Sequence, residues 1–425
     1  MALGIDMSSY SIEVMALTSG RDVAAYERVL LEEGIIRNGI VQKKDMLQVA
    51  LDRVLAKLHA RIGSLGGIRA VVNIPDQQTY THYFDVPINL TGKGLTAYLQ
   101  KEAETVIPLE VGDMTATYVA AESSQPSKIT KRILFIGTKK EVTQGILEVL
   151  RAVGVDAPVL DLESLALMRS LIPERSADTV LVLDGGSEAS AMHIFEGHSL
   201  PILSVACPAG GRQATERIAE KMGLSFEEAE KIKCVFSLLK APRVVTEADD
   251  SPPSLPEGEN PKDIAKEVSV ILHDWYQLVI ADARKAIAFY EMTYHKRVAG
   301  IILSGGSAML PGVVSYLTAW IERPVRLGNP LAHLHSAEVL GKDKPSLMYT
   351  TVVGLALRGI DPLAVGVDFT HGAVTGAKKF FPRVLRSWIP IMLTISAVIL
   401  FILLVYALLL FLGNDGLIRY ERTSA

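Results

Sequence analysis

Cysteine is almost absent from this chain, which has only Cys207 and Cys234 among 425 residues. Two cysteines provide neither a disulfide framework nor the repeated spacing of a zinc site, which fits a reducing compartment. The first residues, MALGIDMSSY, lack the basic stretch and apolar run of a signal peptide. The net charge of −4 gives no basic surplus of the kind that nucleic-acid binding requires. We therefore expect the bulk of the chain in the cytoplasm, with no nucleic-acid partner.

Charged residues are also missing from residues 387–414, which read SWIPIMLTISAVILFILLVYALLLFLGN. A helix of about 25 residues at ~1.5 Å per residue exceeds the ~30 Å hydrocarbon core of a bilayer. The pattern therefore predicts one carboxyl-terminal transmembrane helix over residues 388–412. We expect a basic juxtamembrane linker over residues 361–386 and a short outer tail over residues 413–425. Basic residues concentrate before the helix and place its amino-terminal side in the cytoplasm; they are Lys378, Lys379, Arg383 and Arg386.

The remaining sequence has the alternating strands and helices of an α/β protein and is long enough for two or three structural units. ALGIDMSSYSIEVMAL predicts two strands joined by a polar turn, and TVLVLDGGSEASAMHIF repeats this opening in mid-chain. Between the two openings, strands and helices in mixed order predict a small α+β insert. We divide the chain into a first lobe over residues 1–68 and 157–178, an insert over residues 69–156 and a second lobe over residues 179–360.

A long amphipathic helix is predicted from Ile264 to about Lys296. We interpret its apolar face as core packing rather than as a groove for a partner. The stretch before it, PRVVTEADDSPPSLPEGENPKD, has the composition of a solvated loop. The residues assigned to the apolar face are Val268, Ile271, Leu272, Trp275, Leu278 and Val279.

Three glycine or serine turns each follow an apolar strand: Asp6–Ser11, Asp184–Ser190 and Ser304–Ser307. Such turns expose backbone N–H groups and hydroxyls that can hold an anion. In the first two turns an aspartate ends the strand, where it can hold a magnesium-bound water. A single turn of this kind more often only reverses the chain. The recurrence of the turns along the chain is what favours a ligand site.

The order of the turns resembles the plan of the actin and Hsp70-like ATPases, in which two related lobes clamp a nucleotide. GIDMSSYS resembles the first phosphate loop, LDGGSEAS the second, and LSGGSAMLPG the adenosine loop. CPAGGRQATERIAEKMGLSFEEAEKIK resembles the matching stretch of PilM-type proteins of type IV pilus assembly. AVVNIPDQQTYTHYFDVP resembles the insert that PilM and the cell-division protein FtsA carry, and TTVVGLALRG also fits. The resemblance covers about residues 2–360 and implies an actin-like, two-lobed ATPase fold.

The resemblance further implies ATP and Mg²⁺ as cofactors and assigns residues to them by position. Asp6 and Asp184 would hold magnesium through water. Asp161 and Glu163 lie near the place where actin-like ATPases polarise attacking water, but a solvated strand end explains them equally well, and no catalytic base is assigned. The residues assigned to the phosphates are Ser8, Ser9, Ser11, Gly185, Gly186 and Ser187, those assigned to the ribose are Gly210, Gly211 and Glu216, and those facing the adenosine are Ser304, Gly305 and Gly306.

Two departures from the PilM pattern bear on these roles. PilM-type proteins commonly carry a basic residue near the end of the first phosphate hairpin, where this chain has Glu13. A carboxylate facing phosphate in a partly dry cleft costs about a kcal/mol or more, so weakened or lost nucleotide binding and at most a weak ATPase are expected. PilM is also usually soluble, whereas one transmembrane helix after a PilM-like domain resembles GspL of type II secretion, without the periplasmic ferredoxin-like domain that GspL carries.

Three functions from different classes follow from these observations. The favoured one is a scaffold at the bacterial inner membrane that joins a PilN-like bitopic membrane protein to a pilus or secretion motor ATPase, with nucleotide as a structural or switching ligand. The partner surface would include the insert around Asn73–Pro87. The alternative is a membrane-tethered, FtsA-like filament-forming protein. A sugar kinase of the same fold is least favoured, because no aspartate stands in a recognisable substrate loop.

Overall fold

The computed structural model describes residues 1–63, 66–121, 129–156, 158–236, 261–336, 346–361, 363–370, 401, 404 and 405. The chain divides into two compact units, Met1–Ala377 and Lys378–Ala425. Among the described residues, no helix is both long enough and apolar enough to cross a bilayer. The transmembrane helix expected over residues 388–412 lies outside the described part except for Phe401, Leu404 and Val405, and it stays a prediction.

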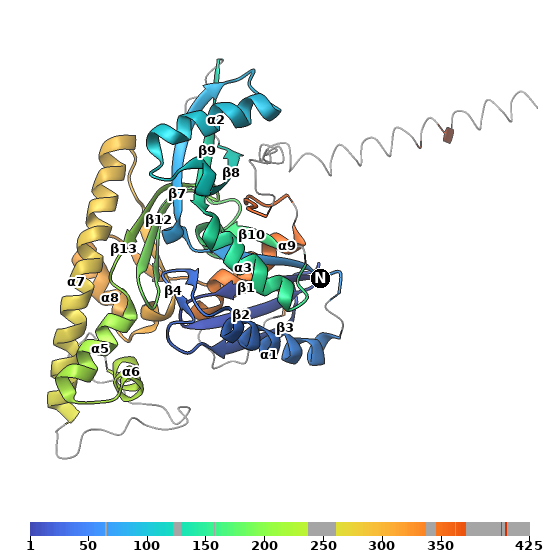
Figure 1. Ribbon diagram of the computed structural model, residues 1–425. Coiled ribbons are helices and arrows are strands. Elements are labelled where there is room, and N and C mark those ends of the chain that lie inside the picture. The colour runs from blue at the N-terminus through green and yellow to red at the C-terminus, as the bar shows by residue number, and fades with distance from the viewer. Residues whose placement is uncertain are drawn as a thin grey trace, which may run out of the picture. The chain divides into compact units, whose positions relative to one another are not determined.

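The first unit contains two five-stranded sheets with the same plan (Figure 1). In each sheet the first strand pairs antiparallel with the hairpin strand that follows it and parallel with a strand from later in the chain. The repeated opening in the sequence is therefore the start of two related lobes. The first sheet has the order β10-β6-β1-β2-β3, formed by β1 (Ala2–Met7), β2 (Ser11–Leu17), β3 (Val23–Leu30), β6 (Arg69–Ile74) and β10 (Val159–Leu162). The second has the order β13-β12-β11-β14-β15, formed by β11 (Thr179–Gly185), β12 (Ser190–Glu196), β13 (Pro201–Cys207), β14 (Gly300–Ser304) and β15 (Val325–Leu327).

Helices cover both faces of the first sheet, so its central strands are buried on each side. Leu47 and Leu51 of α1 (Lys44–Ile62) and Ile146 of α3 (Lys140–Ala152) join the core cluster that contains Leu3 and Ile5 of β1. On the other face, α4 (Glu163–Leu171) and α9 (Thr350–Ile360) pack together. A Cβ atom at Gly4 would lie 2.4 Å from the Val352 carbonyl oxygen of α9, so glycine permits this close approach.

The second sheet packs against α7 (Pro261–Tyr294), α8 (Val313–Ile321) and, at the amino-terminal end of α7, α5 (Gly211–Met222) and α6 (Phe226–Val235). The long helix predicted from Ile264 is α7, and Val268, Leu272, Trp275 and Val279 lie in its buried face as expected. Leu278 was assigned to the same face, but its side chain is 50% exposed. The reason is helical geometry, because Leu278 lies about 100° around the helix from Val279 and faces outward.

The insert is a three-stranded sheet with the order β7-β9-β8, covered on one face by α2 (Gly92–Val106). Its strands are β7 (Thr79–Pro87), β8 (Met114–Ala120) and β9 (Thr130–Lys139). A small hairpin of β4 (Ile36–Arg37) and β5 (Ile40–Val41) belongs to the first lobe. Short 3-10 helices occupy Asp76–Gln78, Val111–Asp113, Gly306–Met309, Pro330–His333 and Ser346–Tyr349.

Three elements join the first lobe although the sequence division placed them elsewhere. Strand β6 pairs with β1, and α3 packs on α1, whereas both were assigned to the insert. Helix α9 packs on β1 and β2 rather than on the second sheet. A sequence division cuts the chain into consecutive segments, whereas the lobe is assembled from segments that return to it from far along the chain.

The segment after α9 also returns to the first sheet, beside its edge strand β10. Phe369 N donates to the Leu160 carbonyl oxygen at 3.1 Å, and Val367 N donates to Asp161 Oδ1 at 2.9 Å. The side chains of Val367 and Phe369 are buried in the core of the first lobe. The part of the expected linker over residues 363–370 is therefore packed into the lobe.

Candidate functional site

The second and third turns lie against each other at the ends of two parallel strands. Asp184 at the end of β11 is in register with Ser304 at the end of β14. Gly305 has φ +80°, and a Cβ atom there would lie 2.6 Å from the Gly185 carbonyl oxygen and 2.9 Å from Asp184 Oδ1. Glycine is needed here for both its backbone conformation and its small volume. The turns that the sequence singled out are thus assembled into one surface of the second lobe.

The start of α5 joins the same surface. Gly211 N donates to the Gly186 carbonyl oxygen at 3.0 Å, and Arg212 N donates to the Ser187 carbonyl oxygen at 2.9 Å. A Cβ atom at Gly210 would lie 2.2 Å from the Ser187 carbonyl oxygen. Gly210 and Gly211 therefore lie directly beside the second turn, where a ribose between phosphate and adenosine loops is expected.

The first turn closes the hairpin between β1 and β2 through Ser8. Ser8 Oγ accepts from Ser11 N at 3.0 Å and from Tyr10 N at 3.2 Å, and Ser8 N donates to the Ser11 carbonyl oxygen at 2.9 Å. Ser9 stands at the tip of this turn, between Ser8 and Tyr10, and is partly exposed. The Ser11 hydroxyl donates to Glu13 Oε1 at 2.7 Å. The hydroxyls of Ser8 and Ser11 thus shape the turn, and their bonds would have to rearrange for either to contact a phosphate.

Three carboxyl groups with raised pKa values, those of Asp6, Glu163 and Asp184, lie close enough to influence one another, and we call them the acidic cluster. Burial raises the pKa of Asp6 well above its usual range, and the neighbouring carboxylates Glu13 and Asp184 raise it further. The pKa of Glu163, the first residue of α4, is also well above its usual range, because of burial and then Asp184 and Asp6. Burial raises the pKa of Asp184 in the same way. Acidic groups held this close favour a bound cation or a bound proton.

The donor set fits a hydrated magnesium ion rather than a metal held by protein ligands alone. Asp6 Oδ1 is buried and has no hydrogen-bond partner in the part of the chain that the structure describes. No group of three or more histidine, cysteine, aspartate or glutamate side chains there is arranged to ligate a metal directly. Mg²⁺ keeps several of its waters and commonly binds through one or two carboxylates and the substrate phosphates. Asp6 and Asp184 suit that mode.

Asp161 and Glu163, which the sequence could not separate, have different surroundings. Asp161 is fully buried, and its Oδ2 lies 2.7 Å from Arg169 Nη2. Its other oxygen accepts from Val367 N, so Asp161 belongs to the internal structure of the first lobe. Glu163 belongs to the acidic cluster. Beside it, Asp76 accepts from Ser164 N and from the Ser164 hydroxyl, each at 2.6 Å, and so fixes the start of α4.

The charge of Glu13 is paired. Glu13 on β2 is opposite Asp6 on β1 and opposite Arg28 on β3. Arg28 Nε lies 2.6 Å from Glu13 Oε1. Burial raises the pKa of Glu13, and the Arg28 guanidinium opposes that rise. A basic residue is thus present on the strand next to the first hairpin, as Arg28. Its charge offsets the repulsion between Glu13 and phosphate, which was the reason to expect weakened nucleotide binding.

A buried lysine beside Gly211 was not expected from the sequence. Lys233 of α6 is buried, and its Nζ donates to the Gly211 carbonyl oxygen at 3.1 Å, to Thr215 Oγ1 at 2.8 Å and to Glu230 Oε2 at 2.7 Å. The string EEAEKIK contains Glu230 and Lys233 three residues apart, a spacing that places both on one helix face. That spacing is the signal that could have found them. Glu216, assigned to the ribose from sequence, is more than half exposed and lies 3.5 Å from Arg212.

The two lobes touch at the open side of this site. Arg212 Nη1 of α5 lies 3.1 Å from Glu33 Oε1 of the first lobe. Asn38 N, between β4 and β5, donates to Glu188 Oε2 in the second turn at 2.8 Å. These contacts place the first lobe beside the second turn and the start of α5.

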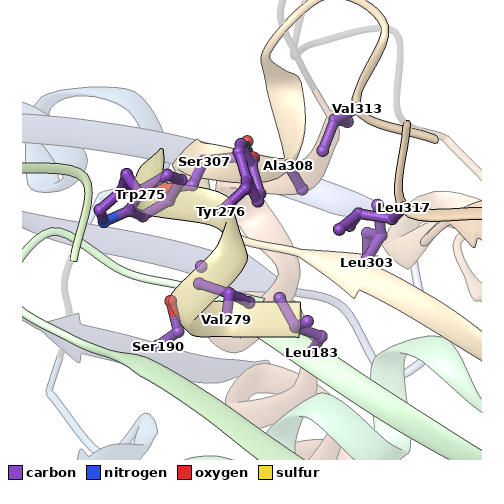
Figure 2. Close-up of a pocket in the computed structure, with 11 residues that line it drawn as sticks. Leu183, Ser190, Trp275, Tyr276, Val279, Leu303, Ser307, Ala308, Val313 and Leu317 are labelled. Atoms are coloured by element: carbon purple, nitrogen blue, oxygen red, sulfur yellow. Dashed lines mark hydrogen bonds between the residues drawn. The ribbon is translucent and has the colours of Figure 1, made fainter. Parts of the chain in front are cut away.

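A small cavity lies behind the third turn, among residues of β11, β14, α7 and α8 (Figure 2). Its volume is about 10 Å³, and Tyr276 and Trp275 line one side of it. The Tyr276 hydroxyl donates to the Ser307 carbonyl oxygen at 2.7 Å. A space of this size holds at most one water molecule. The residues around this space lie behind the third turn, and the space is too small for a nucleobase.

Comparisons with known proteins identify the family. The model of the family described as "Type IV pilus assembly protein PilM" matches residues 4–241, more than half of the chain. The chain belongs to the PilM family. The model of the cell division protein FtsA matches residues 181–354 of this PilM-family chain. The predicted family and its actin-like fold are thereby confirmed.

Individual relatives agree with this assignment. The FtsA of Pseudomonas aeruginosa is 26% identical over 236 residues, covering 54% of each chain. The FtsA of Neisseria meningitidis serogroup B is 22% identical over 210 residues, covering 48% of this chain and 49% of the relative. The chain thus matches about half the length of these curated relatives.

Solved structures extend the similarity over both lobes. A chain of a "PilM-PilN type IV pilus biogenesis complex" has a TM-score of 0.69 and 18% identity, covering 85% of this chain and 99% of that one. The ethanolamine utilization protein EutJ of Carboxydothermus hydrogenoformans has a TM-score of 0.50 and 14% identity, covering 84% and 89%. At these identities the matches establish the actin-like fold. The GspL-like anchor stays a prediction.

Proposed function

We propose that this PilM-family protein binds Mg-ATP between its lobes and acts as a scaffold at the inner membrane for a PilN-like bitopic partner and a pilus or secretion motor ATPase. The observation that carries the nucleotide part is the proximity of Asp6 from the first turn to Asp184 from the second, with Glu163 beside them. The acidic cluster favours a cation, and Arg28 balances Glu13. The nucleotide serves as a structural or switching ligand that ties the lobes together.

Within this proposal the residues have distinct roles. Asp6 and Asp184 hold the waters of Mg²⁺, while Glu163 is near enough to this pair to orient a further water. The second turn holds the phosphates through backbone N–H groups, and Gly305 and Gly306 face the adenosine. Lys233 and Glu230 contact the ribose beside Gly211, a position that their hydrogen bonds to one another and to Gly211 support. Magnesium supplies charge neutralisation of the phosphates when bound.

The experiment is a titration with Mg-ATP, read by thermal shift and by phosphate release. Micromolar binding with little turnover is the expected result, and Asp6→Asn abolishes the shift. Asp113→Asn, which alters an exposed carboxylate of the insert, keeps it. No shift at millimolar Mg-ATP in the unaltered protein contradicts the nucleotide proposal.

The partner surface of this proposal is β7 of the insert. Asn73, at the start of the region expected to contact a partner, is buried and holds Met7 N at 2.8 Å, so it is occupied inside the lobe. Strand β7 instead lies at the edge of its sheet and exposes Tyr80 and His82. An extended cytoplasmic peptide can add to such an edge as a further strand. The chain of the PilM–PilN complex that matches this fold supports the choice of a PilN-like partner.

The peptide contact is tested by pull-down of a PilN-like protein with variants of β7. Thr81→Pro removes a backbone N–H from the strand and should abolish capture. Lys93→Pro, in the first turn of α2 where proline is tolerated, is the matched control and should leave capture intact. Equal capture by both variants contradicts strand addition at β7.

The alternative function, a membrane-tethered filament, is favoured by the FtsA model match over residues 181–354. Sedimentation of the full-length chain on vesicles with and without Mg-ATP separates the two. Nucleotide-dependent, concentration-dependent polymers favour the filament, and a constant small assembly favours the scaffold. In both cases the membrane contact is assigned to residues 388–412.

A further inference from the structure

Helix α7 is apolar on its outer face as well as on the face that it buries. Seven exposed positions form a stripe that we name the α7 seam: Val270, Asp274, Leu278, Ala281, Lys285, Phe289 and Met292. Because successive residues turn by about 100°, all seven fall within an arc of about 100° on the helix surface. The exposed fractions of the large apolar members are 55% for Val270, 50% for Leu278, 55% for Phe289 and 77% for Met292.

The α7 seam is on the outside of the first unit. Figure 1 shows α7 along one side of this unit, with β12 and β13 on its inner side. The buried face of α7 already supplies the core through Trp275, Tyr276 and Val279. A second apolar stripe adds nothing to that core and leaves large apolar side chains in water. Asp274 and Lys285 lie between the apolar members, so the stripe is a mixed surface that suits a helix contact in which charges are paired as well as apolar side chains.

The spacing of the seam is that of a helix-to-helix contact. Its members recur every three or four residues, as at the contact line of paired helices. From Val270 to Met292 the seam extends about 33 Å at 1.5 Å per residue. An interface this narrow is at the small end of those that hold proteins together. The contact is therefore expected to be reversible.

The positions of the charged side chains along the seam indicate which partner binds there. Asp274 and Lys285 are the two charged members, and they lie equally far from the midpoint between Val279 and Ile280. Lys285 also pairs with Asp282 of its own helix at 3.1 Å, but its side chain is 78% exposed and can face a second charge. When a second α7 runs antiparallel about that midpoint, Asp274 of each copy faces Lys285 of the other. The same two-fold axis places Val270 opposite Phe289 and Leu278 opposite Ala281. A parallel arrangement would instead place like charges opposite one another, which is unfavourable.

We propose that the α7 seam is a homodimer interface, in which two copies of this chain pair through antiparallel α7 helices. The contact is isologous, since each copy contributes the same surface. A groove of about 860 Å³ beside Val270, lined also by Ile271 and Lys266, adjoins one end of the seam. In the antiparallel register Met292 of the second copy lies opposite Glu267, which lines this groove together with five other charged side chains and with Val270 and Ile271.

Charge reversal tests the register on the full-length chain by light scattering over a concentration series. Asp274→Lys and Lys285→Asp each place like charges together twice per dimer and are expected to weaken association about tenfold or more, that is by about 1.4 kcal/mol or more. The double variant restores both pairs and should return association to within about threefold of the unaltered chain. Lys93→Glu and Asp113→Lys, at exposed positions of the insert, are controls that leave it unchanged. Unchanged association in either single reversal overturns the proposal.

Cysteine cross-linking provides an independent test in a Cys234→Ser background. Leu278→Cys should be captured as a dimer by a short bis-maleimide, because the two copies of residue 278 are offset by only ~4.5 Å along the axis. Met292→Cys should not, because its copies are ~37 Å apart in this register. Equal capture at both positions indicates parallel helices, and capture at neither indicates a monomer or another occupant. Each of these two outcomes refutes the antiparallel homodimer.

Discussion

At the scale of single residues, the acidic cluster around Asp6 exposes a conflict between stability and binding. Asp6, Glu163 and Asp184 all have raised pKa values, because burial and mutual repulsion disfavour their charged forms. Such strain is commonly kept where a ligand relieves it. Removing a charge from this cluster should therefore stabilise the ligand-free protein and weaken its binding of the ligand.

Asp6→Asn is the direct test of this conflict. The amide keeps the shape of the side chain and removes the buried charge, so the free protein should gain about 1 kcal/mol or more in unfolding free energy. The stabilisation by Mg-ATP should disappear in the same variant. Denaturant unfolding with and without Mg-ATP gives both values. Loss of stability in the ligand-free variant would contradict the strain that we infer.

The pH dependence has a definite sign. A carboxyl whose pKa is higher in the folded state than in the unfolded state binds more protons when folded, so the free energy of unfolding falls as pH rises through that interval. For Asp6 the interval begins near the usual value of 3.8 and extends to its raised pKa. Ligand-free protein should therefore become more stable, relative to Asp6→Asn, as pH is lowered from 7 toward about 5. Parallel pH profiles of the two proteins contradict this.

At the scale of elements, Arg169 of α4 connects three segments that are far apart in sequence. Its guanidinium donates to the Gly354 carbonyl oxygen of α9 at 2.8 Å and to the Val365 carbonyl oxygen at 2.6 Å, and it pairs with Asp161 of β10 at 2.7 Å. Both charged side chains are buried. A buried pair of this kind holds elements in place mainly because neither partner tolerates the loss of the other.

Arg169→Ala should cost about 3 kcal/mol, because it leaves the buried Asp161 with only the more distant Arg358 guanidinium, at 3.9 Å, as an ionic neighbour. Hydrogen exchange at Val367 and Phe369 should also accelerate, since these residues lie beside β10. Arg151→Ala, at an exposed position of α3, is the control and should change stability by less than about 0.5 kcal/mol. An equal effect of the two substitutions would exclude a specific role for Arg169.

Elements were also where sequence reasoning was strongest. The two strand–turn–strand openings, the long helix α7 and the three turns were all predicted from local patterns, because glycine position and apolar spacing act over a few residues. Arg28, Lys233 and Asp76 were not found as site residues. Each of these residues lies on a strand or helix that becomes a neighbour of the site only when the chain folds. Leu278 was misplaced because a list of apolar residues does not by itself fix the angle at which each one leaves the helix.

At the scale of the whole first unit, polar contacts join the two lobes beside the second turn. The Arg212–Glu33 pair and the Asn38–Glu188 hydrogen bond connect them there, and the Tyr83 hydroxyl connects the insert to the Pro201 carbonyl oxygen at 2.8 Å. Exposed contacts of this kind each contribute about 0–1 kcal/mol. These contacts contribute little to holding the lobes together, whereas the apolar cluster that contains Leu3 of the first sheet and Ile302 of the second spans both lobes.

Removing the two contacts together, as Glu33→Ala with Glu188→Ala, should enlarge the radius of gyration of the ligand-free protein in X-ray scattering. Mg-ATP should reverse the enlargement if it bridges the lobes. The matched control is Lys44→Ala with Glu148→Ala, which removes an exposed ion pair within the first lobe. Enlargement in the control, or none in the cleft variant, would contradict control of the lobes by these contacts.

The packing of residues 363–370 beside β10 has a mechanical consequence. If the far end of the chain is held in a membrane, as we propose, tension on it first reaches Phe369 and Val367 and passes through their hydrogen bonds to Leu160 and Asp161. Helix α9 is shielded by this arrangement. The strand that receives the pull ends at Leu162, immediately before Glu163. A pull on the membrane anchor would therefore act one residue away from Glu163 of the acidic cluster. Strand β10 would then transmit membrane tension to the nucleotide site.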